Sequence, residues 1–439
     1  MTTLRNTVLA SVFALWGMGA AAQTPAENSA RIFRTEVTPY ANREDAVARR
    51  TSAEHVLKFE PATTNAPVGG EIVHRVEIPL KWHSGDIYLH LENIPSAYIL
   101  EVNGHRVARI EDMAAAADFR ITRYITDAEN EFRLRFVDAG AKALSQNLPE
   151  GKPFAGSRLY AQDHRAIVDY EAEIVPDPEG RNFGILHINA VVRNAYTTNE
   201  PLRVHFDLYD PAGKLVDHNN LTQVIPAGAT DTIRFSTHVY GAYKYKWTAR
   251  KTNPGLYKAM LFINRQGTYK EYMPFNLGFG KTEWVDGKLT RFGEELVLKK
   301  TVLNATDQKT TILKLKSLRK QGFNTITPDY PQPEWFYAAC DELGLYVIDQ
   351  ADIRLDEKRE DRSVGGTPSN DPKLVEEFAE RVKAMYYRSR NHVSVIAYSL
   401  GAPSGNGYNM YKAYEWLKSV EKSRPVIYSD ADGEWNSDL

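Results

Sequence analysis

The periodicity of hydrophobic residues along this chain changes near residue 296, and that change constrains the fold more than any other feature. Before it, short stretches such as His74–Pro79 and Asp86–Leu91 alternate or run apolar between turn residues, which is typical of β-strands. After it, short apolar stretches alternate with longer segments of helical periodicity. Strands in series favour β-sandwiches, whereas repeated strand–helix units favour a parallel sheet. The sequence therefore predicts a multidomain protein, β-rich first and α/β last.

Two β-rich units are expected before this change in hydrophobic periodicity. The first covers residues 30–162 and contains Asn103-Gly104, a hairpin signal because both residues tolerate the positive φ of a type I′ turn. Many short strands in series predict a β-sandwich there. The second covers residues 163–280, with strands such as Ile185–Val192 and Tyr257–Ile263. Its length and strand spacing predict an immunoglobulin-like sandwich.

The α/β unit is expected over residues 281–439. Thr310–Gln321 has the apolar spacing of an amphipathic helix, and Leu345–Asp349 is typical of a buried strand. Asp371-Pro372 supplies an N-cap and first residue for a further helix. About five strands are visible before Leu439. This pattern fits either a doubly wound sheet or a (β/α)₈ barrel.

The N-terminus has the features of an export signal. Arg5 precedes the apolar run Val8–Met18, and Ala20-Ala21-Ala22 forms an A-x-A-like cleavage site. Residues 1–22 are therefore predicted to be a signal peptide, and the mature protein to be periplasmic or secreted. The apolar run is too short to span a bilayer, and we see no other run of spanning length.

Composition excludes several classes of partner and cofactor. The 54 Lys and Arg residues balance 56 Asp and Glu residues, which argues against a nucleic-acid binder. The single Cys340 excludes an internal disulfide and a thiolate zinc cluster. No metal motif, phosphate-binding loop or dinucleotide fingerprint is present, so no cofactor is expected.

Several short motifs occur in a fixed order along the mature chain. They are Val102-Asn103-Gly104, Asp118–Thr122, Trp247 with Pro254–Tyr257, Gly278-Phe279-Gly280, Asn324–Ile326, Tyr330-Pro331, Trp335–Asp349, Arg390–Ile396 and Ser423–Val426. Their order and wording resemble glycoside hydrolase family 2, which includes β-galactosidases and β-glucuronidases. The resemblance implies a jelly-roll, galactose-binding-like sandwich over residues 30–162, an immunoglobulin-like sandwich, and then a TIM-barrel domain, here truncated after about five strands. It also implies a retaining β-glycosidase ancestry.

The resemblance fails at the catalytic positions. A retaining glycosidase needs two carboxyl groups, one as acid/base and one as nucleophile. The family's acid/base glutamate falls on Pro403, and the asparagine before it falls on Ala402. Gln350 replaces a family glutamate, and the chain ends at Leu439 before the position of the nucleophile. These departures predict a degenerate, non-catalytic member that binds carbohydrate or acts as a scaffold for another exported protein.

Other side chains at the ends of the predicted strands offer alternatives. Asp329 and Asp352 are the candidate substitute carboxylates of a still active retaining β-glycosidase. Together with Asp349 they are also a candidate cation site, the alternative being that Asp349 only caps a loop. The candidate sugar-binding residues are Asp349, Gln350, Tyr330, Trp335 and Asn406. A third interpretation is a truncated gene product, whose open barrel edges a homo- or hetero-oligomer would cover.

Overall fold

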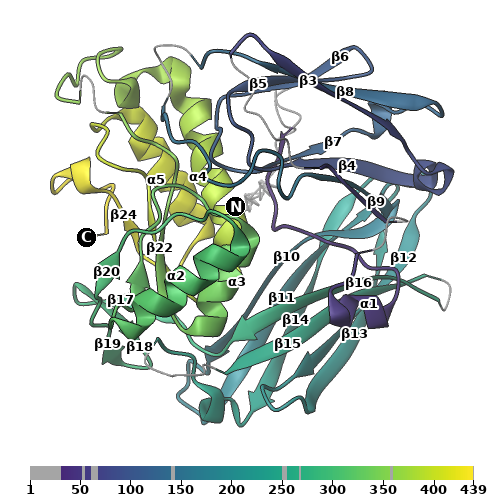
Figure 1. Cartoon of the computed structure of the whole chain (residues 1–439). Coiled ribbons are helices and arrows are strands. Elements are labelled where there is room, and N and C mark those ends of the chain that lie inside the picture. The colour runs from purple at the N-terminus through teal and green to yellow at the C-terminus, as the bar shows by residue number, and fades with distance from the viewer. Residues whose placement is uncertain are drawn as a thin grey trace, which may run out of the picture.

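The computed structural model describes residues 31–51, 55–60, 68–139, 144–249, 255–265, 268–355 and 359–438. Their strands and helices form two β-rich blocks and one α/β block, seen side by side in Figure 1. The predicted signal peptide at residues 1–22 lies outside the described residues, so it stays a prediction. Within the described part of the chain, every helix is too short or too polar to cross a membrane.

Two antiparallel sheets form the first block, in the orders β1-β7-β4-β9-β2 and β3-β8-β5-β6. Their bounds are β1 Arg31–Ile32, β2 Val56–Lys58, β3 Glu71–Glu77, β4 Gly85–Leu91, β5 Tyr98–Val102, β6 His105–Ile110, β7 Ala117–Arg120, β8 Glu129–Phe136 and β9 Arg158–Asp163. Side chains of both sheets, including Leu89 and Phe132, share one buried core. The predicted hairpin is confirmed, because Asn103 and Gly104 have φ of 50° and 77° between the paired strands β5 and β6.

The second block also contains two antiparallel sheets, in the orders β10-β11-β14 and β13-β12-β15-β16. The bounds are β10 Arg165–Pro176, β11 Phe183–Asn194, β12 Glu200–Tyr209, β13 Leu215–Ile225, β14 Thr230–Tyr240, β15 Leu256–Arg265 and β16 Thr268–Gly278. Burial alternates residue by residue along β11, as expected for a strand with one face on a core. The short helix α1 (Arg43–Ala48) packs on this block, where Ala46 joins a small cluster with Met260 and Tyr272.

The α/β block is built on five parallel strands in the order β20-β21-β22-β23-β24. The strands are β20 Lys300–Thr301, β21 Thr325–Ile326, β22 Tyr346–Gln350, β23 Val395–Ser399 and β24 Val426–Ile427; the helices are α2 Gln308–Lys320, α3 Glu334–Leu343, α4 Val375–Ser389 and α5 Tyr408–Val420. A three-stranded antiparallel sheet of β17 Thr282–Val285, β18 Lys288–Arg291 and β19 Glu294–Glu295 precedes them. Sequential strand order is that of a barrel wall, whereas a doubly wound sheet reverses its order at a switch point.

Local sequence explains where the helices begin and end. Asp307 caps α2 by accepting a hydrogen bond from the Thr310 backbone N–H at 3.0 Å. Gly344 ends α3 with a left-handed φ of 67°, which glycine adopts without strain. The predicted helix start at Asp371 needs correction by a few residues. Asp371 caps the 3₁₀ turn Pro372–Leu374, and α4 itself begins at Val375.

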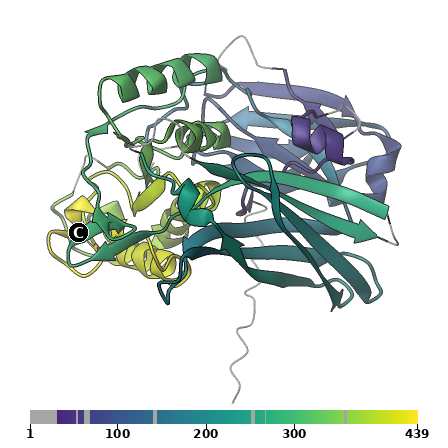
Figure 2. The same cartoon turned by 90° about the horizontal axis from the view of Figure 1, so that it is seen from below.

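The α/β block contacts the second β-rich block at a junction of buried side chains. Figure 2 shows the two blocks from below. The buried Trp247 donates from its indole Nε1 to the Asp341 carbonyl oxygen at 2.8 Å. At the end of β16, Gly278 lies against Val393, which precedes β23. A Cβ on Gly278 would meet the Val393 side chain at 2.4 Å. The junction therefore depends on a residue without a side chain.

Replacing Gly278 with alanine should loosen this junction. The φ of Gly278 lies outside the positive range, so the cost comes from the clash with Val393 and not from backbone strain. We expect Gly278→Ala to lower the free energy of unfolding by about 1–3 kcal/mol, measured by urea denaturation. The double variant Gly278→Ala/Val393→Ala should recover part of that loss, because it removes the clashing atoms. Equal stability of Gly278→Ala and the wild type would contradict the contact.

Candidate functional site

The carboxyl ends of the parallel strands carry a connected set of polar groups. Gln350, the last residue of β22, donates from Nε2 to the Asp329 carbonyl oxygen at 2.9 Å. Ser399, the last residue of β23, lies 3.5 Å from the Gln350 Oε1 atom. In barrels this edge of the sheet presents the reacting groups. We call Asp329, Gln350, Ser399 and Pro403 the strand-end site.

Pro403 occupies an exposed position in the loop that follows β23. The loop is held by backbone groups, because Ala402 N–H donates to the Ile353 carbonyl oxygen at 2.9 Å. Ser404 is buried, accepts from the Leu355 N–H at 3.0 Å and donates to the Ala402 carbonyl oxygen at 2.8 Å. The side chains of Ala402 and Pro403 carry no proton to give and no oxygen to accept one. This position therefore cannot supply general acid or base catalysis.

Asp329 is the accessible carboxylate of the strand-end site, with its side chain 30% exposed. Arg354 approaches one of its oxygens at 3.2 Å. Asn304 donates to the other oxygen at 3.0 Å. Both oxygens of the Asp329 carboxyl group thus already accept a hydrogen bond from a described residue. Its surroundings suit recognition of a hydroxyl group better than proton donation.

The structure corrects the expectation for Asp352, because its side chain is only 1% exposed. Its Oδ2 atom accepts from Arg381 at 2.9 Å, and its Oδ1 atom accepts from Asn147 at 2.8 Å. Arg381 also donates to the Glu111 carbonyl oxygen at 3.2 Å. Asp352 thus joins α4 to the first β-rich block. A carboxylate enclosed in this way is out of reach of a substrate.

Asp349 is completely buried and is directed into the protein rather than to solvent. Its Oδ1 atom accepts from the Tyr337 hydroxyl at 2.9 Å and from the Gln350 N–H at 3.1 Å. Burial raises the pKa of Asp349 to about 7. Across the described ranges, no three His, Cys, Asp or Glu side chains gather as a metal site would require. The cation site considered for Asp329, Asp349 and Asp352 is therefore not formed by these residues.

The raised pKa of Asp349 makes a prediction about pH. A carboxyl whose folded-state pKa lies above its unfolded value stabilises the fold most below about pH 4, and this contribution is lost as the pH rises to about 7. An asparagine side chain at the same position would not ionise. Between pH 4 and pH 8, the free energy of unfolding of Asp349→Asn should therefore rise by about 2–4 kcal/mol relative to that of the wild type, as measured by urea denaturation. If the free energy of unfolding depends on pH in the same way for both proteins, this prediction is contradicted. Asp329→Asn is the matched control.

The remaining candidate sugar-binding residues lie in different surroundings. Tyr330 is 4% exposed, and Asn406 is 3% exposed with its amide bonded to Asn436 at 2.9 and 3.1 Å. Asn406 is therefore a structural residue and its candidacy as a ligand is corrected. Trp335 lies on α3, where it packs against the α/β core and lines a separate cavity beside β16. The structure thus does not bring Trp335 to the strand-end site.

Sequence reasoning missed the arginines that surround these acids. Besides Arg354 and Arg381, Arg359 forms a bidentate pair with Asp430 at 2.8–3.1 Å. Asp430 also accepts from the Gly405 N–H at 2.8 Å, which fixes the loop after Pro403. Arg354 is close to Asp352 in sequence, so a charge signal was present, but its partner Asp329 was not evident. The arginines leave each of these acids neutralised.

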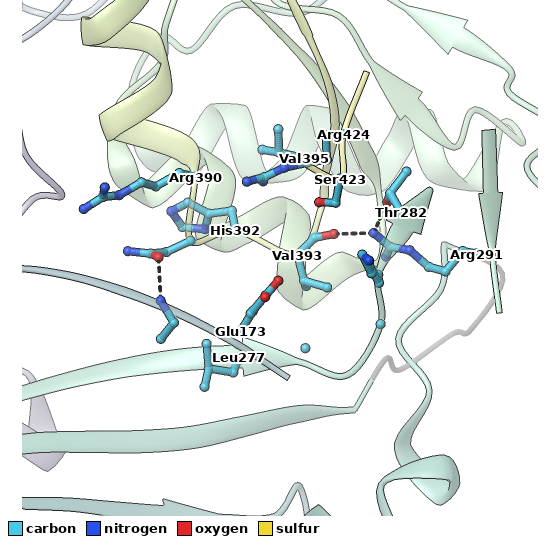
Figure 3. Close-up of a pocket in the computed structure, with 15 residues that line it drawn as sticks. Glu173, Leu277, Thr282, Arg291, Arg390, His392, Val393, Val395, Ser423 and Arg424 are labelled. Carbon is cyan, nitrogen blue, oxygen red and sulfur yellow. Dashed lines mark hydrogen bonds between the residues drawn. The ribbon is translucent and has the colours of Figure 1, made fainter. Parts of the chain in front are cut away.

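The pocket in Figure 3 lies at the other end of the sheet, near the residues that precede β23 and β24. Glu173 of β10 faces it together with Arg424 and Ser423, and Arg291 donates to Thr282 and to the Val393 carbonyl oxygen. Its volume is about 50 Å³. That is far below the roughly 300–1,000 Å³ of ligand pockets and suits a few water molecules. It is a small gap at the junction between the α/β block and the second β-rich block.

Comparisons with known proteins agree with this architecture. The profile for "Glycosyl hydrolases family 2, TIM barrel domain" matches residues 304–438. The β-galactosidase of Priestia megaterium is 26% identical over 391 residues, covering 84% of this chain and 37% of the relative. The β-galactosidase of Oenococcus oeni is 26% identical, covering 79% and 34%. The chain thus spans about a third of the length of these curated relatives.

Solved structures share the fold. A β-glucuronidase from Bacteroides uniformis superposes with a TM-score of 0.68 at 16% identity, covering 82% of this chain and 46% of that one. A family 2 glycosyl hydrolase from Bacteroides cellulosilyticus gives 0.67 at 16% identity, covering 84% and 51%. The β-sheet blocks and the barrel-type sheet share the fold of these solved structures. Residues 304–438 match the glycoside hydrolase family 2 TIM-barrel model, and the chain as a whole is similar to proteins of that family.

Proposed function

We propose that this chain is a non-catalytic member of glycoside hydrolase family 2 that binds β-linked sugars at the strand-end site without cleaving them. The observation that carries the proposal is Pro403, which stands where the family motif has its acid/base glutamate. The neutralised surroundings of Asp329 and the burial of Asp352 support it, because neither acid is placed as a substitute. The proposal rests on these side chains and not on where the chain ends.

The partly exposed groups of the strand-end site suit a sugar. Gln350 offers an amide and Asp329 a carboxylate with free acceptor capacity. Ser399, close to Gln350, is buried, and its hydroxyl donates to the Gly401 carbonyl oxygen at 3.0 Å. Amide and carboxylate groups together can accept from and donate to the hydroxyls of a neutral ring. The protein would then still bind carbohydrate at this edge of the sheet after losing the ability to cleave the glycosidic bond.

One observation favours a second function, an active retaining β-glycosidase. Asp329 is a partly exposed acid at a strand end, where barrel enzymes place their catalytic groups. Activity would require a second carboxyl group about 5–5.5 Å from it and access for a glycoside. Loss of turnover in Asp329→Asn would identify this function, so that variant belongs in every activity test.

The proposal includes export and a partner surface. The predicted signal peptide supports a periplasmic or secreted location, which fractionation of expressing cells tests directly. Within the described strands, β20 and β24 each pair on one side only. A second chain, identical or different, is our proposal for covering these sheet edges. Light scattering of the purified protein should then give a mass above 49.6 kDa, the mass of one full chain.

Saturation-transfer NMR with methyl β-D-galactopyranoside tests binding and cleavage in one sample. We expect saturation to be transferred from the wild-type protein to the sugar, and no new anomeric signals to appear with time. Gln350→Ala should weaken binding about tenfold, because one amide contact contributes about 1–1.5 kcal/mol. Absence of transfer would overturn sugar binding at this site, and a growing signal of free galactose would overturn the non-catalytic role.

A further inference from the structure

A cavity of about 320 Å³ lies between α3, β16 and the segment over residues 35–49. We call it the α3 cleft; Tyr40, Phe275, Asn276, Gln308, Glu334 and Trp335 are among the residues that line it. Its volume falls within the roughly 300–1,000 Å³ of small-molecule pockets. Residues of the strand-end site do not line it, so the two sites are separate.

Most charged groups of the α3 cleft already have partners. Glu36 lies between Arg158 and Arg388, which hold its pKa at about 2. His392 lies 2.7 Å from Asp341 through its Nδ1 atom. These pairs fix the walls of the cleft, and their charges are satisfied. Few polar groups of the cleft therefore remain available to a ligand, and these groups indicate the chemistry of that ligand.

Glu334 is a partly buried carboxyl group of the cleft that lacks such a partner, whereas Glu342 is exposed to solvent. Within the described part of the chain, the Glu334 carboxyl makes no hydrogen bond and no ion pair. Burial raises its pKa. Asn276 likewise makes no side-chain hydrogen bond to the described residues. A carboxyl and an amide thus face one cleft with unused hydrogen-bonding capacity, and such groups gain most from a ligand rich in hydroxyls.

Aromatic rings supply the apolar part of the same cleft. Trp335 is half-buried on α3, and Tyr40, Tyr170 and Phe275 line the opposite side with small exposed areas. An aromatic face offers a large contact area to the C–H face of a flat ring. Aromatic rings beside convergent polar groups are the usual make-up of a pocket for a partly polar small molecule.

The charges narrow the ligand class further. The carboxyl groups that line the cleft outnumber the guanidinium groups, and this excess disfavours an anion. The carboxyl groups are those of Glu36, Glu334, Asp341 and Glu342, and the guanidinium groups those of Arg49 and Arg388. A metal ion is disfavoured, because the described residues offer no group of three ligands. We propose that the α3 cleft binds a neutral saccharide, with its ring against Trp335 and its hydroxyls at Glu334 and Asn276. This inference rests on the cleft and is independent of whether the strand-end site is catalytic.

Titration calorimetry in the Gln350→Ala background isolates this cleft from the strand-end site. The probes are lactose, methyl β-D-glucopyranoside and the anionic methyl β-D-glucuronide. We expect both neutral sugars to bind and the glucuronide to bind at least fivefold more weakly than the glucopyranoside. Adding Asn276→Ala should raise the Kd for the neutral sugars about tenfold. Adding Glu334→Gln should reduce the difference in Kd between the neutral sugars and the anionic glucuronide.

A volume change gives a test that does not depend on one hydrogen bond. Ala338 of α3 lines the cleft, and Ala338→Leu keeps a good helix former while filling space. Binding should be lost in Ala338→Leu and kept in Leu313→Ala, a change on the exposed face of α2. Equal melting temperatures establish that both variants fold. No sugar binding, binding unaffected by Ala338→Leu, or tighter binding of the glucuronide would each overturn this inference; glycoside turnover would overturn only the proposed function.

Discussion

Arg381→Met should lower the free energy of unfolding by about 3–5 kcal/mol, because it leaves the Asp352 carboxylate buried without its cation. Both side chains are almost fully enclosed, at 2% and 1% exposure. Arg381 donates to the Asp352 backbone carbonyl at 2.6 Å as well as to its carboxylate. Urea denaturation at pH 7 measures the loss. Arg381→Met removes charge but keeps much of the side-chain volume.

The matched control is the double variant Arg381→Met/Asp352→Leu. Replacing a buried ion pair with apolar residues is often neutral for stability, whereas removing one partner is costly. We therefore expect the double variant to recover most of the loss. A loss below about 1 kcal/mol in Arg381→Met would contradict the tight enclosure of Asp352, because breaking a buried pair typically costs several kcal/mol. Asp352 would then return as a candidate catalytic acid.

Trp247→Ala should destabilise the protein by about 3–5 kcal/mol, as expected for a fully buried tryptophan. The indole packs with Tyr346 at a ring-centroid distance of 5.8 Å, and the Arg291 guanidinium lies 5.1 Å from its ring. Its hydrogen bond to Asp341 joins the second β-rich block to α3. The melting temperature and urea midpoint report the effect.

Trp247→Phe separates packing from hydrogen bonding. Phenylalanine keeps most of the apolar contact but cannot donate to the Asp341 carbonyl oxygen, so we expect a smaller loss, about 1–2 kcal/mol for the bond and its unpaired acceptor. If Trp247→Phe is as costly as Trp247→Ala, the hydrogen bond rather than packing holds the junction. If neither variant is destabilised, the described junction is not a stabilising contact.

Much of the fold follows from local sequence. The predicted helix Thr310–Gln321 corresponds to α2 at Gln308–Lys320, and the predicted strand Leu345–Asp349 to β22 at Tyr346–Gln350. Strong apolar periodicity explains this agreement. Strand β13 was missed because its residues, including Asp217, Asn219 and Asn220, are mostly exposed and polar, so no alternation marks them. Tertiary pairing with β12 makes this segment a strand.

The site was less accessible to sequence reasoning. Pro403 was found because a motif fixes its position, and the structure places it in an exposed loop after β23. The ion partners were not found because they are distant in the chain: 29 residues separate Arg381 from Asp352, and 71 separate Arg359 from Asp430. Whether an acid is free or paired depends on these contacts, which no local pattern encodes.

Turnover of aryl β-glycosides by the purified protein tests the central claim most directly. The panel is the 4-nitrophenyl β-D-galactoside, β-D-glucuronide, β-D-glucoside and β-D-mannoside, with Asp329→Asn and Asp352→Asn beside the wild type. Because Pro403 carries no carboxyl group and Asp352 is enclosed, the strand-end site lacks the pair of carboxyl groups that a retaining glycosidase needs. We therefore expect no release of nitrophenol above the rate without protein. Turnover that persists through purification and disappears in Asp329→Asn would contradict the account and establish a relocated catalytic acid at the strand-end site.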